Sequence, residues 1–94
     1  MRLTDNERII IVNIIQKIDP NANVYLFGSR IDNSKLGGDI DLLIHSQQLN
    51  KYQLRAIKWQ LLEQLGEQKI DILLSQELKE PFVRLILPEA IKLK

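Results

Sequence analysis

The apolar residues of this chain recur first at helical and then at strand spacing. Behind Thr4, which with Glu7 has the spacing of a capping box, apolar positions three and four apart indicate a helix that ends at Asp19-Pro20. The apolar face of this helix is wider than one stripe, so it is either packed on two sides or keeps part of that face for a partner. We favour burial.

Three short apolar runs without helical spacing predict strands. They lie at residues 24–27, 39–45 and 69–74 and are rich in Val, Ile, Leu and aromatic residues. Residues 31–38 contain Asn, Ser and a Gly-Gly pair, so we expect a loop between the first two strands.

Two more helices are predicted in the second half. Asn50 and Gln53 can form another capping box ahead of apolar positions at helical spacing, and Gly66 is a natural end for that helix. Pro81 suits the first turn of a last helix running to about Leu87, whose nearly all-round apolar surface we expect to be mostly buried. Residues 89–94 can add a short edge strand.

This order of elements predicts a single compact α/β domain over residues 1–94. A net charge of +1 argues against electrostatic nucleic-acid binding, so we expect no direct nucleic-acid contact. The chain has no cysteine and one histidine, which excludes disulfides, thiolate metal sites and histidine-rich zinc sites. No apolar run approaches membrane length and the N-terminal residues are too polar for a signal peptide. We therefore expect no membrane contact and a cytoplasmic location.

Two carboxylates alternate with apolar residues in the second predicted strand. Asp39 and Asp41 share one face of that strand, about 7 Å apart at Cα. Like charges this close are unfavourable unless a cation lies between them. If the third strand lies beside the second, Asp71 joins them, and ligation by oxygen alone favours Mg²⁺ or Mn²⁺. Taken singly, each motif is more often structural, because Asp-x-Asp can mark a turn and Asp71 can face solvent.

Gly28-Ser29-Arg30 follows the first predicted strand and has the properties of a phosphate cradle. Glycine lets the backbone approach a ligand closely, while the serine hydroxyl and a following helix N-terminus donate hydrogen bonds to anionic oxygens. Arg30 can hold a phosphate or brace the acidic segment. By itself the motif is more often a strand-ending glycine with a serine cap. The combination with the carboxylates favours a nucleotide site.

Together these motifs resemble the nucleotidyltransferase superfamily with the polymerase-β palm fold, and in particular its minimal nucleotidyltransferase (MNT) branch. The resemblance rests on Gly28-Ser29, the loop 30–38, Asp39-Ile40-Asp41 and the later Asp71, and it spans residues 5–93. It implies a small mixed sheet flanked by helices. Gly37-Gly38 and the scarcity of arginine in the loop depart from many relatives.

The resemblance also implies an activity. Asp39, Asp41 and Asp71 would hold two Mg²⁺ ions, and Asp71 could accept the acceptor's proton. Gly28, Ser29 and Arg30 would bind the triphosphate of a nucleoside triphosphate, most often ATP. Members of this branch are commonly antitoxins paired with a helical toxin of the HEPN type, and some add AMP to a tyrosine of that toxin. Homo- and hetero-oligomers are both compatible with this.

Two alternatives stay open. One is an antitoxin that neutralises its partner by binding alone, with the acidic cluster dispensable. The other is an enzyme that modifies a small molecule such as an aminoglycoside, against which the lack of a second domain counts.

Two further side chains are candidates for a functional role. His45 lies about 13 Å along its strand from Asp41, so a polar contact at the strand end is favoured over a ligand role. Trp59 falls outside the apolar stripe of its predicted helix and is either an interface anchor or a surface aromatic.

Overall fold

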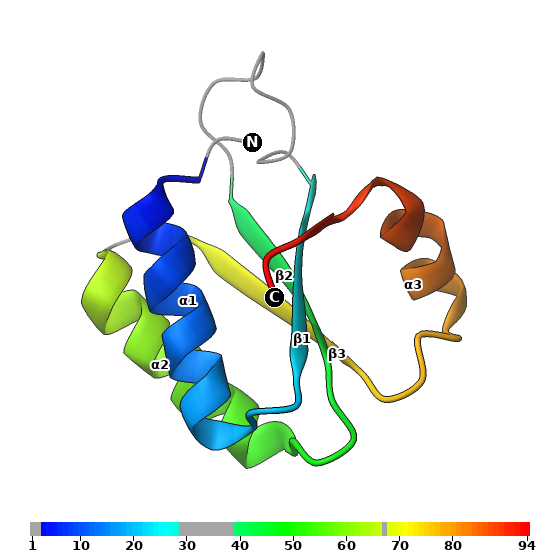
Figure 1. The fold of residues 1–94 in the computed structure, drawn as a ribbon, viewed down its shortest axis with the longest axis horizontal. Coiled ribbons are helices and arrows are strands. Elements are labelled where there is room, and N and C mark those ends of the chain that lie inside the picture. The colour runs from blue at the N-terminus through cyan, green and yellow to red at the C-terminus, as the bar shows by residue number, and fades with distance from the viewer. Residues whose placement is uncertain (1–2, 29–38, 67) are drawn as a thin grey trace.

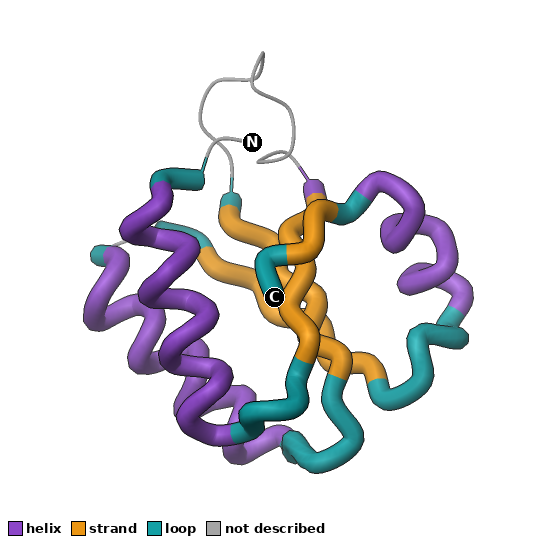
Figure 2. The backbone as a smooth tube through the Cα atoms, in the orientation of Figure 1, coloured by secondary structure: helices purple, strands orange, loops and turns teal. Residues whose placement is uncertain are grey.

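Helices and strands alternate along the chain, as the apolar pattern predicts (Figure 1). The structure is a computed structural model that describes residues 3–28, 39–66 and 68–94. In chain order its elements are α1 (Asp5–Ile18), β1 (Asn23–Phe27), β2 (Ile40–His45), α2 (Lys51–Leu65), β3 (Ile70–Ser75), α3 (Pro81–Ile86), the short 3₁₀ helix η2 (Leu87–Glu89) and β4 (Ile91–Lys92). Loops and turns join these elements at both ends of the sheet (Figure 2).

The strands form one mixed sheet in the order β3-β2-β1-β4. β1 pairs antiparallel with both β2 and β4, whereas β2 and β3 run parallel. The parallel pair is possible because α2 carries the chain back across the sheet between its two strands. The predicted α+β fold, with a small mixed sheet flanked by helices, is confirmed, and β4 is the expected edge strand.

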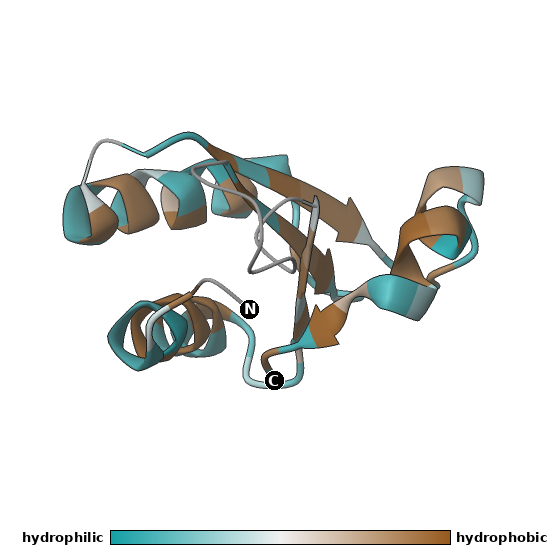
Figure 3. Cartoon of the chain, turned by 90° about the horizontal axis from the view of Figure 1, so that it is seen from above, coloured by the Kyte–Doolittle hydropathy of each residue, from teal (hydrophilic) through white to brown (hydrophobic). Residues whose placement is uncertain are grey.

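The main core lies between the sheet and the pair α1 and α2. Both helices cover the same face of the sheet, and α3 lies on the other side (Figures 1 and 3). The fully buried side chains on this side alternate along the strands with half-buried ones, as expected for a face packed on helices. The core side chains include Ile11, Ile15, Val24, Leu26, Ile40, Leu42, Ile44, Ile57, Leu61 and Ile70.

Both long helices begin at the predicted capping boxes. The amide of Glu7 donates to Oγ1 of Thr4 (3.0 Å), and the amide of Thr4 donates to Oε1 of Glu7 (2.9 Å). The same reciprocal pair joins Asn50 and Gln53 at the start of α2. Gly66 ends α2 with φ of 85°, a conformation that L side chains rarely adopt.

The expectation that the last helix is mostly buried was wrong in part. Val83 is buried, but Phe82 and Leu85 remain 54% and 76% exposed. With only six residues, α3 presents one side to the sheet and leaves the other to solvent. No helix in the described part of the chain is long and apolar enough to cross a membrane.

Candidate active site

The strand register brings two of the predicted carboxylates side by side. Asp41 of β2 is the direct parallel partner of Asp71 in β3, and it is also the antiparallel partner of Phe27 in β1. Residues in register share a face of the sheet. Phe27, Asp41 and Asp71 therefore form a row across three strands, on the face that α1 and α2 do not cover. We call these three residues the carboxylate row.

Asp39 lies one residue before β2 and extends the negative charge beyond this row. Its Oδ2 lies 3.7 Å from Nζ of Lys69, in an ion pair whose side chains are both well exposed. Lys69 was missed by the sequence reasoning, which treated it only as the start of the third strand. The backbone explains the encounter, because the amide of Ile40 donates to the carbonyl of Lys69 where the two strands begin.

The environment raises the pKa of the Asp41 carboxyl above 3.8. Burial is the largest cause, followed by repulsion from Asp71 and then from Asp39, while Lys69 acts in the opposite direction. Asp71 and Asp39 are thus close enough to disfavour the charged form of Asp41. A site with this excess of negative charge favours a bound cation.

Gly28 lies directly against the Asp41 carboxylate. Its φ is +79°, and a Cβ at this position would overlap Oδ2 of Asp41 and lie 3.1 Å from its Cγ. Both the backbone conformation and the space therefore require glycine here. The Gly-Ser motif and the Asp-x-Asp motif, a dozen residues apart in sequence, meet at this point. The other two predicted members of the phosphate cradle, Ser29 and Arg30, lie outside the described residues.

The donor set of this site suits a hard cation. Asp39, Asp41 and Asp71 supply carboxylate oxygens without sulfur or imidazole, which is the ligand chemistry of Mg²⁺. Their mutual repulsion at Asp41 agrees with such a role. In the described residues, however, no three His, Cys, Asp or Glu side chains are gathered into a ready metal-binding group. The three residues fit a divalent ion in donor type, and the strand register sets Asp41 beside Asp71.

A comparison of the whole chain with known protein families found a match. The chain matches the family model described as Polymerase beta, Nucleotidyltransferase over residues 10–94. It belongs to this nucleotidyltransferase family. No curated protein matched the chain. Membership supports nucleotidyl transfer as the general activity of the domain.

An aromatic pair borders the carboxylate row of this nucleotidyltransferase domain. The ring of Phe27 meets that of Phe82 on α3 edge to face, with centroids 6.2 Å apart and planes at 76°. The sequence reasoning did not connect these rings, since they are far apart in the chain. No sequence signal linked them, because the exposure of Phe82 and its contact with Phe27 become visible only in the structure.

A second group missed from sequence lies at the β3 edge of the domain. Arg55 and Lys58 of α2 line a pocket of about 230 Å³ together with Leu54, Asp71 and Ile72. Both cations have the spacing of neighbours on one helix face. They place positive charge near one end of the carboxylate row.

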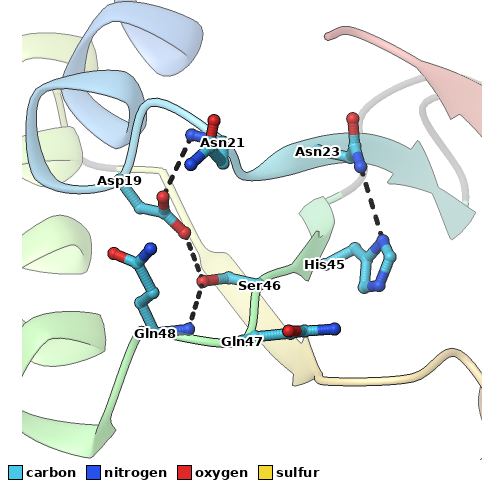
Figure 4. Close-up of a pocket in the computed structure, with 7 residues that line it drawn as sticks. All are labelled: Asp19, Asn21, Asn23, His45, Ser46, Gln47 and Gln48. Atoms are coloured by element: carbon cyan, nitrogen blue, oxygen red, sulfur yellow. Dashed lines mark hydrogen bonds between the residues drawn. The ribbon is translucent and has the colours of Figure 1, made fainter.

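A polar pocket lies at the end of the sheet opposite the candidate site, and its hydrogen bonds stabilise the fold. It measures about 200 Å³ and is lined by Asp19, Asn21, Asn23, His45, Ser46, Gln47 and Gln48 (Figure 4). The buried Asp19 carboxylate accepts from Oγ of Ser46 and from the amide of Asn21. These bonds fasten the turns after α1 and β2 to each other.

His45 makes the predicted polar contact at the end of its strand. Its Nε2 lies 3.1 Å from the carbonyl oxygen of Gln76. Its Nδ1 lies 3.4 Å from Nδ2 of Asn23, and Figure 4 shows this second contact. Because a carbonyl only accepts, Nε2 carries the proton and Nδ1 accepts from Asn23. Both ring nitrogens are engaged far from Asp41, which agrees with the expectation that His45 is no ligand of the site.

Proposed function

We propose that this chain is a Mg²⁺-dependent nucleotidyltransferase that transfers AMP from ATP to a hydroxyl group. The observation that carries the proposal is the strand register, which sets Asp41 beside Asp71 while Gly28 packs against the Asp41 carboxylate. Family membership supports the transfer in general. ATP as donor and Mg²⁺ as cofactor (Mn²⁺ has the same ligand chemistry) extend the resemblance described above.

In the proposed reaction the acceptor oxygen attacks the α-phosphorus of ATP. A new phosphorus–oxygen bond forms to the acceptor, the bond between the α-phosphorus and its bridging oxygen breaks, and pyrophosphate leaves. Asp71, the most exposed member of the carboxylate row, takes the acceptor's proton. Divalent ions bound to Asp39, Asp41 and Asp71 would offset the negative charge of the phosphates. The backbone of Gly28 allows the triphosphate close approach, and Ser29 and Arg30 would hold its oxygens.

We further propose that the acceptor is a tyrosine of a helical HEPN-type partner, so that the chain acts as an antitoxin. Large aromatic side chains stand uncovered on one face of α2, where Tyr52 is 79% and Trp59 64% exposed. Tyr and Trp are the residue types that most often anchor protein interfaces. This exposure supports a protein partner in general.

The same face supports a second candidate function, neutralisation of the partner by binding alone. The finding that favours it is the lack of a ready metal-binding group in the part of the chain that the structure describes. The two functions differ in whether the carboxylates are needed.

The test is transfer of label from ATP to the co-purified partner in the presence of Mg²⁺. We expect radioactivity from α-labelled ATP, and none from γ-labelled ATP, to become covalently attached to the partner. Asp39→Asn and Asp41→Asn should each reduce the rate by at least about 100-fold, because each removes a charged oxygen donor from the site. Glu63→Gln, which neutralises an exposed carboxylate on α2, serves as the matched control.

Three results separate the alternatives. Labelling that survives both aspartate substitutions contradicts the assigned site. Neutralisation that survives them without any labelling supports the binding-only function. Labelling and neutralisation that are lost together support the enzyme.

A further inference from the structure

An uncovered aromatic ring lies at the edge of the candidate site. Phe82 keeps 54% of its surface exposed although it contacts Phe27, the residue in register with Asp41. Folding normally hides a ring of this size, since burying a Phe side chain stabilises a protein by about 1.5–3 kcal/mol. Val83, the next residue, is buried, so α3 is anchored to the rest of the protein there while Phe82 stays largely exposed.

The position of Phe82 is fixed by its neighbours. Pro81 starts α3, and Glu80 before it accepts a hydrogen bond from Oγ of Ser75 at the end of β3 (3.1 Å). Oγ of Ser75 also accepts from the amide of Leu78 (2.8 Å). The turn between β3 and α3 is thereby tied to the sheet. A ring held in advance loses little conformational freedom when a ligand stacks on it.

We propose that Phe82, backed by Phe27, is a stacking platform for the nucleobase of the nucleoside triphosphate. This inference rests on the proposed function and names the subsite for the base. The phosphates belong at Asp41, the middle member of the row and the neighbour of Phe27, where Gly28 lies against the carboxylate. Side chains on neighbouring strands lie about 5 Å apart, and the two rings lie 6.2 Å apart. Phe27 therefore links the Phe82 ring to Asp41.

The chemistry of stacking sets the selectivity of this subsite. Every base has a π-face, so stacking adds affinity with little discrimination between bases. Purines offer more surface than pyrimidines. We therefore expect ATP and GTP to bind similarly, and both to bind more tightly than UTP and CTP.

The experiment compares ATP with inorganic tripolyphosphate, which carries the phosphates without a base. Binding of each to the full chain is measured by calorimetry in the presence of Mg²⁺. Phe82→Ala should weaken ATP binding about 5- to 150-fold, the range expected for loss of one base–aromatic stack, and leave tripolyphosphate binding unchanged. Phe82→Tyr keeps the ring and should retain ATP affinity. Leu85→Ala, which truncates a more exposed apolar side chain of the same helix, should alter the binding of neither ligand.

Each other outcome overturns the proposal. Unchanged ATP affinity in Phe82→Ala removes the platform and leaves the proposed function standing. If Phe82→Ala weakens the binding of ATP and of tripolyphosphate equally, the substitution disturbs the phosphate site. Thermal unfolding of Phe82→Leu, which keeps the apolar bulk, identifies a folding defect. If Phe82→Ala leaves ATP affinity unchanged and lowers only the labelling of the acceptor, the ring belongs to the acceptor's binding site. If the unaltered chain binds neither ligand, the proposed function fails first.

Discussion

At the residue scale, one glycine connects the two halves of the candidate site. Gly28 has positive φ, as Gly66 does, but only Gly28 has a side chain where its Cβ would be. Gly66 has no atom within 4 Å of a Cβ at its position. The two glycines thus share the conformational requirement and differ in the steric one, which makes them a matched pair for experiment.

Alanine at these two positions should separate the two requirements. Each substitution should lower the free energy of unfolding by about 1–3 kcal/mol, because residues with a side chain are strained at such φ. Only Gly28→Ala should depend on Asp41. Adding Asp41→Ala should recover about 1 kcal/mol or more in the Gly28→Ala background, and the combination with Gly66→Ala should be additive within about 0.5 kcal/mol. Urea unfolding of the single and double variants measures both. Additivity at Gly28 would refute the contact with Asp41.

The candidate residues could be predicted from sequence because short motifs carry them. Glycine before a polar residue and aspartates at alternate strand positions are local patterns. The contacts between them were not predictable. The approach of Gly28 to Asp41, and the pairing of Asp39 with Lys69, depend on the lateral position of strands that are separated by a loop or a helix.

At the element scale, the starts of the long helices and the positions of the strands could be predicted from the sequence, because capping residues and apolar alternation are patterns of neighbouring residues. The predicted capping boxes form with both bonds present. The exposure of α3 did not follow, because an apolar sequence does not reveal how much surface the rest of the fold can cover. Phe82 and Leu85 are apolar by type and exposed by position.

The cap of α2 offers a test at this scale. Asn50→Ala removes the side-chain oxygen that accepts from the amide of Gln53 (2.9 Å). We expect the free energy of unfolding to fall by about 1 kcal/mol. Asn50→Asp keeps the acceptor and should retain most of the stability in the same urea experiment. A loss of equal size in both variants would show that the acceptor oxygen is not the source of the stability.

At the scale of the whole molecule, the sheet places a partly buried acid where its charge is unfavourable. The cause is topological: the parallel pairing of β2 with β3 puts Asp71 next to Asp41, whose pKa is raised by burial and by its neighbours. From the sequence, this contact could be predicted only on the condition that the third strand lies beside the second, because no local pattern reveals which strands pair. A fold that accepts such repulsion gives up stability, as proteins commonly do at functional sites.

This repulsion should appear in the pH dependence of unfolding. The pKa of Asp41 is higher in the folded chain than its ordinary value of 3.8. Between the two values the folded state binds more protons than the unfolded state, so the contribution of Asp41 to stability falls as pH rises through that window. Asp41→Asn should therefore be more stable than the unaltered chain at pH 7, and the difference should shrink toward pH 3.

Magnesium should reverse the order at neutral pH. An ion that binds only the folded state, present at 100 times its Kd, adds about 2.7 kcal/mol to the free energy of unfolding. We therefore expect MgCl₂ to raise the Tm of the unaltered chain and EDTA to cancel the rise. The Tm of Asp41→Asn should respond weakly. Glu63→Gln, which removes a carboxylate outside the row, should keep the full response. Thermal unfolding at pH 3, 5 and 7 with and without Mg²⁺ measures all of these. Two results would contradict carboxylate repulsion as the source of the proposed cation affinity. One is an Asp41→Asn chain that is less stable than the unaltered chain at pH 7 without Mg²⁺. The other is an Asp41→Asn chain whose Tm rises as much with Mg²⁺ as that of the unaltered chain.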